Sequence, residues 1–158
     1  MQRDKVKTAA PTGAADADRA VIDSYVLDDQ VGFLMRVATQ RHTAIFAARM
    51  IEGLTPTQFS ALAKLYTVGP CSQNHLGRLI YLDAATIKGV VDRLGARGFI
   101  TALADPKDRR RRAVALTERG REVIEAAIKV ATGITAATLA PLTPDEQAAV
   151  VRLLRKLG

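Results

Sequence analysis

Cysteine, histidine, tryptophan and long apolar runs are scarce or absent in this sequence. One cysteine, Cys71, and two histidines, His42 and His75, occur in 158 residues, and there is no tryptophan. A single cysteine excludes an intramolecular disulfide and a cysteine-based metal site, which favours a reducing compartment. No apolar run approaches the ~20 residues of a membrane span, and the N-terminus lacks the apolar core of a signal peptide. We therefore expect a cytoplasmic protein with no membrane segment and no metal.

Motifs of common enzymes are also absent. There is no glycine-rich phosphate loop, no HExxH zinc motif and no nucleophile elbow. We therefore expect no enzymatic activity, no catalytic residue and no cofactor. Cys71 leaves one alternative open, because a thiol beside a helix start can have a lowered pKa and act as a redox switch.

What the chain does contain is basic charge and aliphatic residues. Lysine and arginine number 23 against 16 acidic residues, which gives a net charge of +7. Such a balance favours a polyanionic partner, nucleic acid before an anionic membrane surface. Lys107 and Arg109–Arg112 fall within six residues, and this clustering is more informative than the total. Hydrophobic residues make up 48% and aromatic residues 4%, which suits a sizeable aliphatic core of mainly helices.

The ends of the chain predict long helices flanking a central unit. Residues 1–24 lack periodic apolar positions and are expected to be a flexible arm, with packing on a partner subunit as the alternative. Residues 27–51 carry an apolar stripe at helical spacing, with Asp28 as a cap and Gly53 as a stop. Two more helices are expected at residues 118–139 and 144–157.

Residues 55–117 follow the order of a winged helix-turn-helix. Thr55 and Pro56 start one helix, a short helix begins after residue 70, and a longer helix follows over residues 84–97 with Asp83 as its cap. Two short strands, 99–103 and 113–116, then flank an arginine-rich turn. The predicted fold is mainly α, with a two- to three-stranded β wing and long N- and C-terminal helices.

The start of the longer helix is the predicted DNA reader. Small and polar side chains in its first turn fit the major groove, and Lys88 can reach guanine or the backbone. The start of the preceding helix can hold a phosphate. Arginines suit phosphates and a narrow minor groove, and Asp108 can brace Arg110. The candidate DNA-contacting residues are Ser72, Gln73, Asn74, Ala84, Ala85, Thr86, Lys88, Lys107, Asp108, Arg109, Arg110, Arg111 and Arg112.

Two members of the first apolar stripe, His42 and Arg49, are not apolar. A cation and an imidazole within a largely apolar cavity suit a small aromatic carboxylate. The alternative is a core histidine whose hydrogen bonds are satisfied within the protein, and it stays open here. The candidate ligand-binding residues are Arg36, Gln40, His42, Arg49, Phe59 and Tyr66.

Two stretches carry a resemblance to a known family. They are DPxDRR at 105–110 followed by VxLTxxG at 114–120, and TIxxVVDRLxxRG at 86–98. From Asp28 to its C-terminus the chain resembles the MarR family of winged helix-turn-helix regulators. The resemblance implies a homodimer, joined by the first and last two helices, that binds a pseudo-palindromic double-stranded DNA operator. It also implies that Arg110 enters the minor groove.

A narrower resemblance lies in QxGFLxR at 30–36 and QRHTAIF at 40–46. These stretches are similar to repressors of aromatic-acid catabolism, most of all those of nicotinic-acid degradation that respond to a hydroxylated nicotinate. The resemblance implies a small aromatic carboxylate effector, such as 6-hydroxynicotinic acid, held by Arg36 and His42. We therefore predict a ligand-responsive repressor with an arm at 1–24 and a single domain at 25–158. The alternatives are a constitutive architectural DNA-binding protein without effector and a redox-sensing regulator acting through Cys71.

Overall fold

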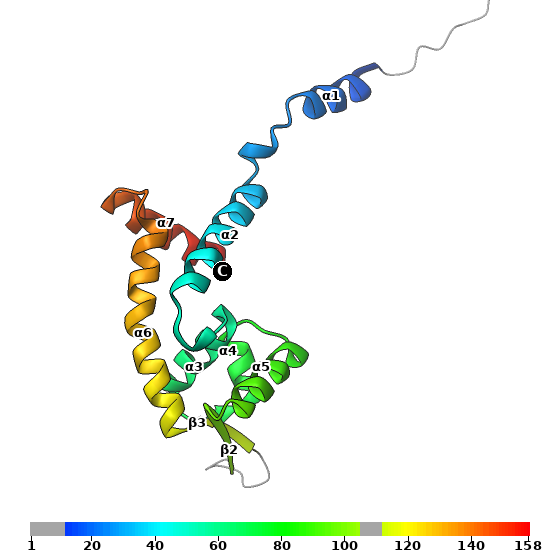
Figure 1. The fold of residues 1–158 in the computed structure, drawn as a ribbon. Helices are drawn as coiled ribbons and strands as arrows, with labels where there is room; N and C mark the ends of the chain where they lie inside the picture. The colour runs from blue at the N-terminus through cyan, green and yellow to red at the C-terminus, as the bar shows by residue number, and fades with distance from the viewer. Residues whose placement is uncertain (1–11, 105–111) are drawn as a thin grey trace, which may run out of the picture. The chain divides into compact units, whose positions relative to one another are not determined.

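The computed structural model describes residues 12–104 and 112–158, which are mostly helical (Figure 1). The elements in chain order are α1 (Thr12–Asp23), η1 (Leu27–Asp29), α2 (Val31–Arg49), η2 (Ile51–Gly53), α3 (Pro56–Val68), β1 (Cys71–Ser72), α4 (Gln73–Leu79), α5 (Ala84–Ala96), β2 (Ile100–Ala104), β3 (Arg112–Leu116), α6 (Glu118–Leu139) and α7 (Pro144–Leu157), where η marks a 3-10 helix. They fall into two compact units, Met1–Thr39 and Gln40–Gly158.

The first unit contains a helix that the sequence analysis did not predict. Its residues Thr12–Asp23 form helix α1. Alanine is frequent there, and Arg19 Nε lies 3.4 Å from Asp23 Oδ1 one turn later, an i,i+4 pair that stabilises a helix. The segment thus forms a helix although its sequence lacks a stripe of apolar residues at helical spacing.

The first long helix also starts later than expected. Asp28 lies inside the 3-10 turn η1, and Gln30 has an extended backbone, so α2 begins at Val31 rather than at residue 27. At its other end α2 stops at Arg49, before η2. The connection between α2 and α3 is therefore short and irregular rather than a simple glycine stop.

In the second unit, side-chain caps fix the helix starts as the sequence predicted. The Thr55 hydroxyl accepts from the Gln58 N–H at 3.2 Å, while Gln58 Oε1 accepts from the Thr55 N–H at 3.1 Å. Thr143 starts α7 with the same reciprocal pair, and Asp83 caps α5. These caps satisfy amides that a helix start otherwise leaves unpaired.

The wing is a three-stranded antiparallel sheet in the order β1-β3-β2. Cys71 pairs with Val114, and Ile100 pairs with Leu116. Strict alternation of inward and outward residues does not hold in β3, because the run 113–115 is buried throughout and Leu116 is half-buried. The reason is that β3 is the middle strand, and its small alanine side chains are covered by neighbouring strands and helices.

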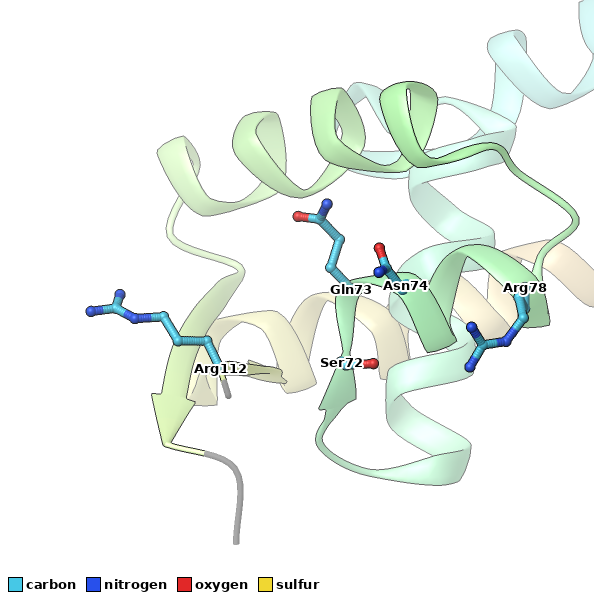
Figure 2. A pocket seen from close by; sticks show the side chains of 5 residues that line it. All are labelled: Ser72, Gln73, Asn74, Arg78 and Arg112. Carbon is cyan, nitrogen blue, oxygen red and sulfur yellow. The ribbon is translucent and has the colours of Figure 1, made fainter. Parts of the chain in front are cut away.

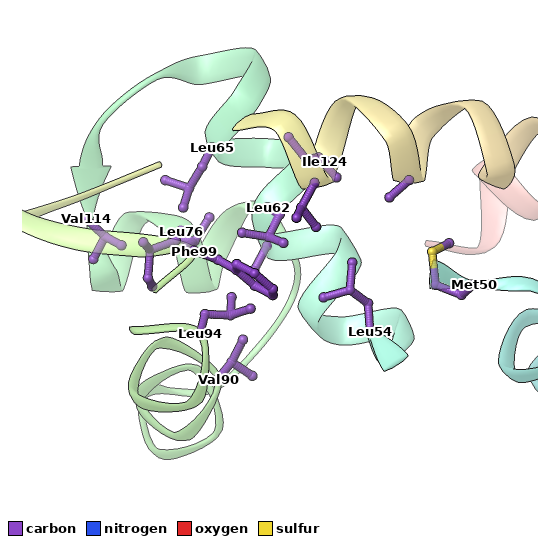
Figure 3. Close-up of a cluster of buried hydrophobic side chains, with 14 of the residues drawn as sticks. Met50, Leu54, Leu62, Leu65, Leu76, Val90, Leu94, Phe99, Val114 and Ile124 are labelled. Carbon is purple, nitrogen blue, oxygen red and sulfur yellow. The ribbon is translucent and has the colours of Figure 1, made fainter. Parts of the chain in front are cut away.

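The hydrophobic core joins the helix-turn-helix to α6 (Figure 3). Phe99 is fully buried at the start of the wing, among side chains from α3, α4 and α5. The largest fully buried side chains among the described residues are Leu62, Leu76, Ile87, Val90, Leu94, Phe99, Ile124 and Ile134. Burial of this kind contributes about 1.5–3 kcal/mol for each large aliphatic side chain, so the core holds α4 and α5 in a fixed position on α3 and α6.

The start of α6 is fastened to the end of α5 through backbone contacts. The Thr117 N–H donates to the Phe99 carbonyl at 3.1 Å, and the Thr117 hydroxyl donates to the Gly98 carbonyl at 2.7 Å. Gly120 donates its own N–H to the Thr117 hydroxyl at 2.9 Å. A Cβ added at Gly120 would lie 1.8 Å from the Phe99 carbonyl oxygen, so only glycine fits this junction.

Among the described residues, no single helix is long and apolar enough to span a membrane. Only α6 and α7 taken together, a pair bent by 108°, reach that length and composition.

Candidate DNA-binding face and effector site

A groove joins the helix-turn-helix to the wing. It has a volume of about 580 Å³ and is lined by Ser72, Gln73, Asn74, Arg78 and Arg112. Figure 2 shows Arg112 of β3 on one side, Arg78 near the end of α4 on the other, and the remaining three side chains between them. We call it the α4–β3 groove. Four of its five residues are among the predicted DNA contacts, and β1–β3 pairing brings them together from segments 40 residues apart, since Ser72 pairs with Ala113.

The first turn of α5 presents the other predicted contacts to solvent. Ala84, Ala85, Thr86 and Lys88 are all exposed. The Thr86 hydroxyl donates to Asp83 Oδ2 at 2.7 Å, and the Thr86 N–H donates to Asp83 Oδ1 at 2.8 Å. These bonds lower the pKa of Asp83, first through the backbone N–H and then through the hydroxyl. The Thr86 hydroxyl therefore uses its proton within the cap and is left with acceptor capacity toward a donor on a base, such as an amino group.

Lys88 is also engaged within the helix. Its Nζ lies 2.6 Å from Asp92 Oδ2, one turn further along α5. Both side chains are well exposed, and exposed i,i+4 pairs of this kind contribute only about 0.3–0.5 kcal/mol. Lys88 can therefore exchange Asp92 for a nucleic-acid acceptor at small cost.

Most of the predicted arginine turn lies outside the residues that the structure describes. This applies to Lys107, Asp108, Arg109, Arg110 and Arg111. In the described part of the wing, β2 ends at Ala104 and β3 begins at Arg112. The DNA-binding roles of these five residues stay predictions.

The second half of α2 is tied to the last turns of α6. Arg41 donates from Nη1 to the Thr138 carbonyl at 2.6 Å and from Nη2 to the Ala137 carbonyl at 3.3 Å. Arg49 Nη1 donates to the Gly133 carbonyl at 3.3 Å. A cation at the carbonyl end of a helix is favourable because that end carries partial negative charge. Arg49, predicted as a ligand contact, thus has a partner within the protein.

His42 joins the same set of contacts and is half-buried. Its Nδ1 lies 2.9 Å from the Thr138 hydroxyl, and that hydroxyl donates to the Ile134 carbonyl at 2.9 Å. Because a hydroxyl has one proton, Nδ1 must be the donor to Thr138. A neutral His42 then carries its proton on Nδ1, and Nε2 is the nitrogen left to accept from another group.

Two other predicted ligand residues, Phe59 and Tyr66, each pack against a different neighbouring side chain. Phe59 packs edge-on against Phe46 at 6.0 Å between ring centroids, and Phe46 lies 6.2 Å from the His42 ring. Tyr66 lies under the Arg121 guanidinium, 5.3 Å from its carbon. The hollow beside Phe59, of about 420 Å³, is lined by α3 and by residues 79–81. The described contacts therefore join His42 and Phe59 through Phe46.

The remaining two candidates stand at the end of the first unit and the start of the second. Arg36, in the first unit, lies over the Phe33 ring at 5.0 Å. Gln40 opens the second unit and is exposed. Their part in ligand binding stays a prediction.

The surroundings of Cys71 bear on the alternative of an activated thiol. Cys71 is half-buried in β1, and this burial raises the pKa of its thiol. A raised pKa means less thiolate near neutral pH, and the thiolate is the reactive form. The environment of Cys71 therefore disfavours the redox alternative.

Three further polar residues in these contacts are not among the candidate site residues predicted from the sequence. Arg78 lines the α4–β3 groove, whereas Arg41 and Thr138 take part in the hydrogen bonds that connect α2 to α6. Arg41 stands next to His42 in a polar stretch of the first long helix, and this adjacency was the available signal. Thr138 lay in a run of small residues that offered no signal, because its role depends on a contact across 96 residues.

Known proteins resemble this chain over most of its length. Residues 54–111 match the model of the MarR family. NicR of Pseudomonas putida, an HTH-type transcriptional repressor, is 42% identical over 134 residues, with 84% of this chain and 85% of NicR covered. A probable transcriptional regulator from Pseudomonas aeruginosa has 51% sequence identity and a TM-score of 0.82, with 84% of this chain and 100% of that chain covered. BpsR of Bordetella bronchiseptica, whose DNA binding is regulated by 6-hydroxynicotinic acid, has 41% identity and a TM-score of 0.79, with 84% and 96% covered.

Proposed function

The chain belongs to the MarR family, and on this premise we propose that it is a ligand-responsive transcriptional repressor. It binds a pseudo-palindromic DNA operator as a homodimer in the cytoplasm, and a small aromatic carboxylate such as 6-hydroxynicotinate releases it. NicR is a repressor, and BpsR responds to 6-hydroxynicotinic acid. These two relatives support the class of function and the class of effector.

The observation that carries the proposal is the α4–β3 groove beside the first turn of α5. Its five described lining residues include two arginines and no acidic side chain. Arg78 and Arg112 flank polar side chains that can donate to phosphate oxygens, while the exposed alanines of α5 can approach thymine methyl groups. In this arrangement α5 reads bases in the major groove, and the groove residues hold the backbone.

Exposed apolar side chains on the terminal helices support the homodimer. Large apolar side chains that are exposed on a helix often mark an interface. Large apolar residues are exposed in α7 and in the first half of α2, and these are Val31, Leu34, Met35, Val37, Val151, Leu153, Leu154 and Leu157. We propose that a second copy covers them, which sets two α5 helices about 34 Å apart, one turn of DNA.

His42 is the residue through which we propose that the effector acts. Its Nδ1 is committed to Thr138, so Nε2 can accept from a ligand hydroxyl in the neutral form or donate to a carboxylate in the charged form. The effector releases DNA only if it binds the DNA-incompetent spacing more tightly than the competent one. A ligand lodged between α2 and α6 fulfils this by changing how these helices meet.

The proposal is tested by selecting a duplex from a randomised pool with the wild-type protein and measuring its affinity by fluorescence anisotropy. 6-Hydroxynicotinate, nicotinate and benzoate are then titrated at fixed salt. We expect a two-fold symmetric selected sequence and release by the hydroxylated nicotinate at the lowest concentration. Failure of every acid to change the affinity would refute the effector.

The constitutive architectural protein remains the second candidate, because His42 has a hydrogen-bond partner within the protein. This function predicts that selection enriches no particular DNA sequence and that none of the three acids changes the affinity for DNA. Selection and titration therefore separate the two functions in one experiment.

A further inference from the structure

The residue that caps the C-terminal end of α5 reaches back to the connection that precedes α3. Arg97, the C-cap of α5, donates from Nη2 to the backbone carbonyl of Glu52, and the same nitrogen lies 3.5 Å from Glu52 Oε2. The two residues are 45 positions apart. Arg97 thus binds both the backbone and the side chain of one residue in the α2–α3 connection (residues 50–54).

That connection has an unusual backbone. Glu52 has φ 54° and ψ 15°, and Gly53 has φ 55°. A positive φ is uncommon for a glutamate because its Cβ is crowded there. Met50 and Leu54, at the two ends, are buried in the core. The connection is therefore anchored at both ends, and Arg97 holds its strained central residue from the side of α5.

The Arg97 side chain is itself held in place. Its guanidinium carbon lies 4.5 Å from the centroid of the fully buried Phe99 ring. The side chain is 31% exposed and that of Glu52 is 41% exposed, so both are partly withdrawn from solvent. A guanidinium fixed on an aromatic face loses little further freedom when it binds a carbonyl and a carboxylate.

We propose that Arg97 is a positioning residue that transmits the position of α2 to the recognition helix α5. The inference rests on the proposed function, because it concerns how an event near His42 reaches the DNA-binding face. The second half of α2 carries His42, ends at Arg49, and continues directly into the connection that Arg97 holds. A shift of α2 that moves Glu52 pulls on the C-terminal end of α5.

Arg119 provides a matched control. Its guanidinium carbon also lies over the Phe99 ring, at 5.1 Å, and among the described residues it makes no hydrogen bond or ion pair with the α2–α3 connection. Arg119→Gln removes a cation from the same ring and leaves Glu52 untouched. Arg97→Gln removes both the cation and the contact with Glu52, while Arg97→Lys keeps one cationic donor.

The measured quantity is the release ratio, the DNA dissociation constant with saturating 6-hydroxynicotinate divided by that without it. We expect Arg97→Gln to lower the ratio roughly two- to thirtyfold, the range found for residues that couple two sites. Arg97→Lys should retain part of the ratio, and Arg119→Gln should keep the wild-type value. An unchanged ratio in a folded Arg97→Gln protein overturns the proposal, as does an equal loss in Arg119→Gln.

Two further measurements keep the outcome clear. If Arg97→Gln does not fold, Glu52→Gln decides, because it keeps the carbonyl contact and removes the ion pair; a ratio equal to wild type then overturns the proposal. Hydrogen exchange without DNA or ligand should be faster in Arg97→Gln both at the Leu54 amide, which donates to the Ile51 carbonyl, and in α5. Unchanged exchange at both places overturns the inference, whereas a wild-type protein that no acid releases refutes the proposed effector alone.

Discussion

Replacing Gly120 with alanine should weaken the protein severely, although it adds a single methyl group to a helix. The new Cβ would lie 1.8 Å from the Phe99 carbonyl oxygen and 2.8 Å from the Phe99 carbonyl carbon. Both are backbone atoms, so no side chain can rotate away. The start of α6 must retreat from the α5–β2 junction by about an ångström before the contact is tolerable.

The retreat costs specific interactions. It breaks the bonds that Thr117 makes to Phe99 and Gly98, each contributing about 1 kcal/mol. Overpacking strain adds about 1–3 kcal/mol, and the better helix propensity of alanine returns at most about 1 kcal/mol. We therefore expect Gly120→Ala to lower the free energy of unfolding by about 2–4 kcal/mol.

The matched control is Gly133→Ala in the same helix, where an added Cβ would meet nothing within 4 Å. That substitution should raise the free energy of unfolding by about 0.5–1 kcal/mol. Urea unfolding followed by circular dichroism measures both, at one protein concentration because association adds to apparent stability. A free energy of unfolding of Gly120→Ala within about 0.5 kcal/mol of the wild-type value would contradict the close contact between Gly120 and Phe99.

The other predictions concern DNA, pH and ligand. Arg112→Gln should weaken binding to specific and random duplexes alike and reduce the slope of log affinity against log salt by about 1, whereas Arg152→Gln on α7 should change neither; anisotropy at four salt concentrations measures this. Hydrogen bonds lower the pKa of Asp83, so its extra stabilisation is complete above the unfolded pKa of about 4 and is lost as pH falls through the lower folded pKa. The difference in urea midpoint between wild type and Asp83→Asn should therefore be constant from pH 7 to 5 and shrink below pH 4, and a constant difference to pH 2.5 would contradict this linkage. His42→Asn keeps a donor toward Thr138 and removes Nε2, so calorimetry should show 6-hydroxynicotinate binding about tenfold more weakly; unchanged affinity would exclude Nε2 as a ligand contact.

Local chemistry decided which parts of the fold could be predicted from the sequence. Thr55, Asp83 and Thr143 cap helices with their own side chains, so the starts of α3, α5 and α7 are written in a few adjacent residues. The position of α1 was missed because its helix depends on propensity rather than on an apolar stripe. The sequence left open whether the wing has two or three strands, because β1 has only two residues and is defined by its pairing with β3.

The candidate sites divide along the same line. The exposed first turn of α5 follows from its cap and its small side chains, both of which are local features. The hydrogen bond between His42 and Thr138 and the contact between Arg97 and Glu52 join residues far apart in the chain. No pattern within either segment could have indicated its partner, because tertiary packing alone brings these residues together.

The ion pair between Lys88 and Asp92 bears on how the protein travels along DNA before it reaches its operator. Attraction to arbitrary sequence comes from cations that displace the counterions condensed on phosphates. Asp92 places one negative charge beside the Lys88 ammonium, so we expect Lys88 to add less to this general attraction than a lysine without a neighbouring carboxylate. When a guanine edge offers acceptors in place of the carboxylate, the lysine changes partner at a cost of about 0.3–0.5 kcal/mol. If Lys88 contacts a base as predicted, this pair lowers the charge that α5 shows to arbitrary sequence and still leaves the lysine available to a guanine.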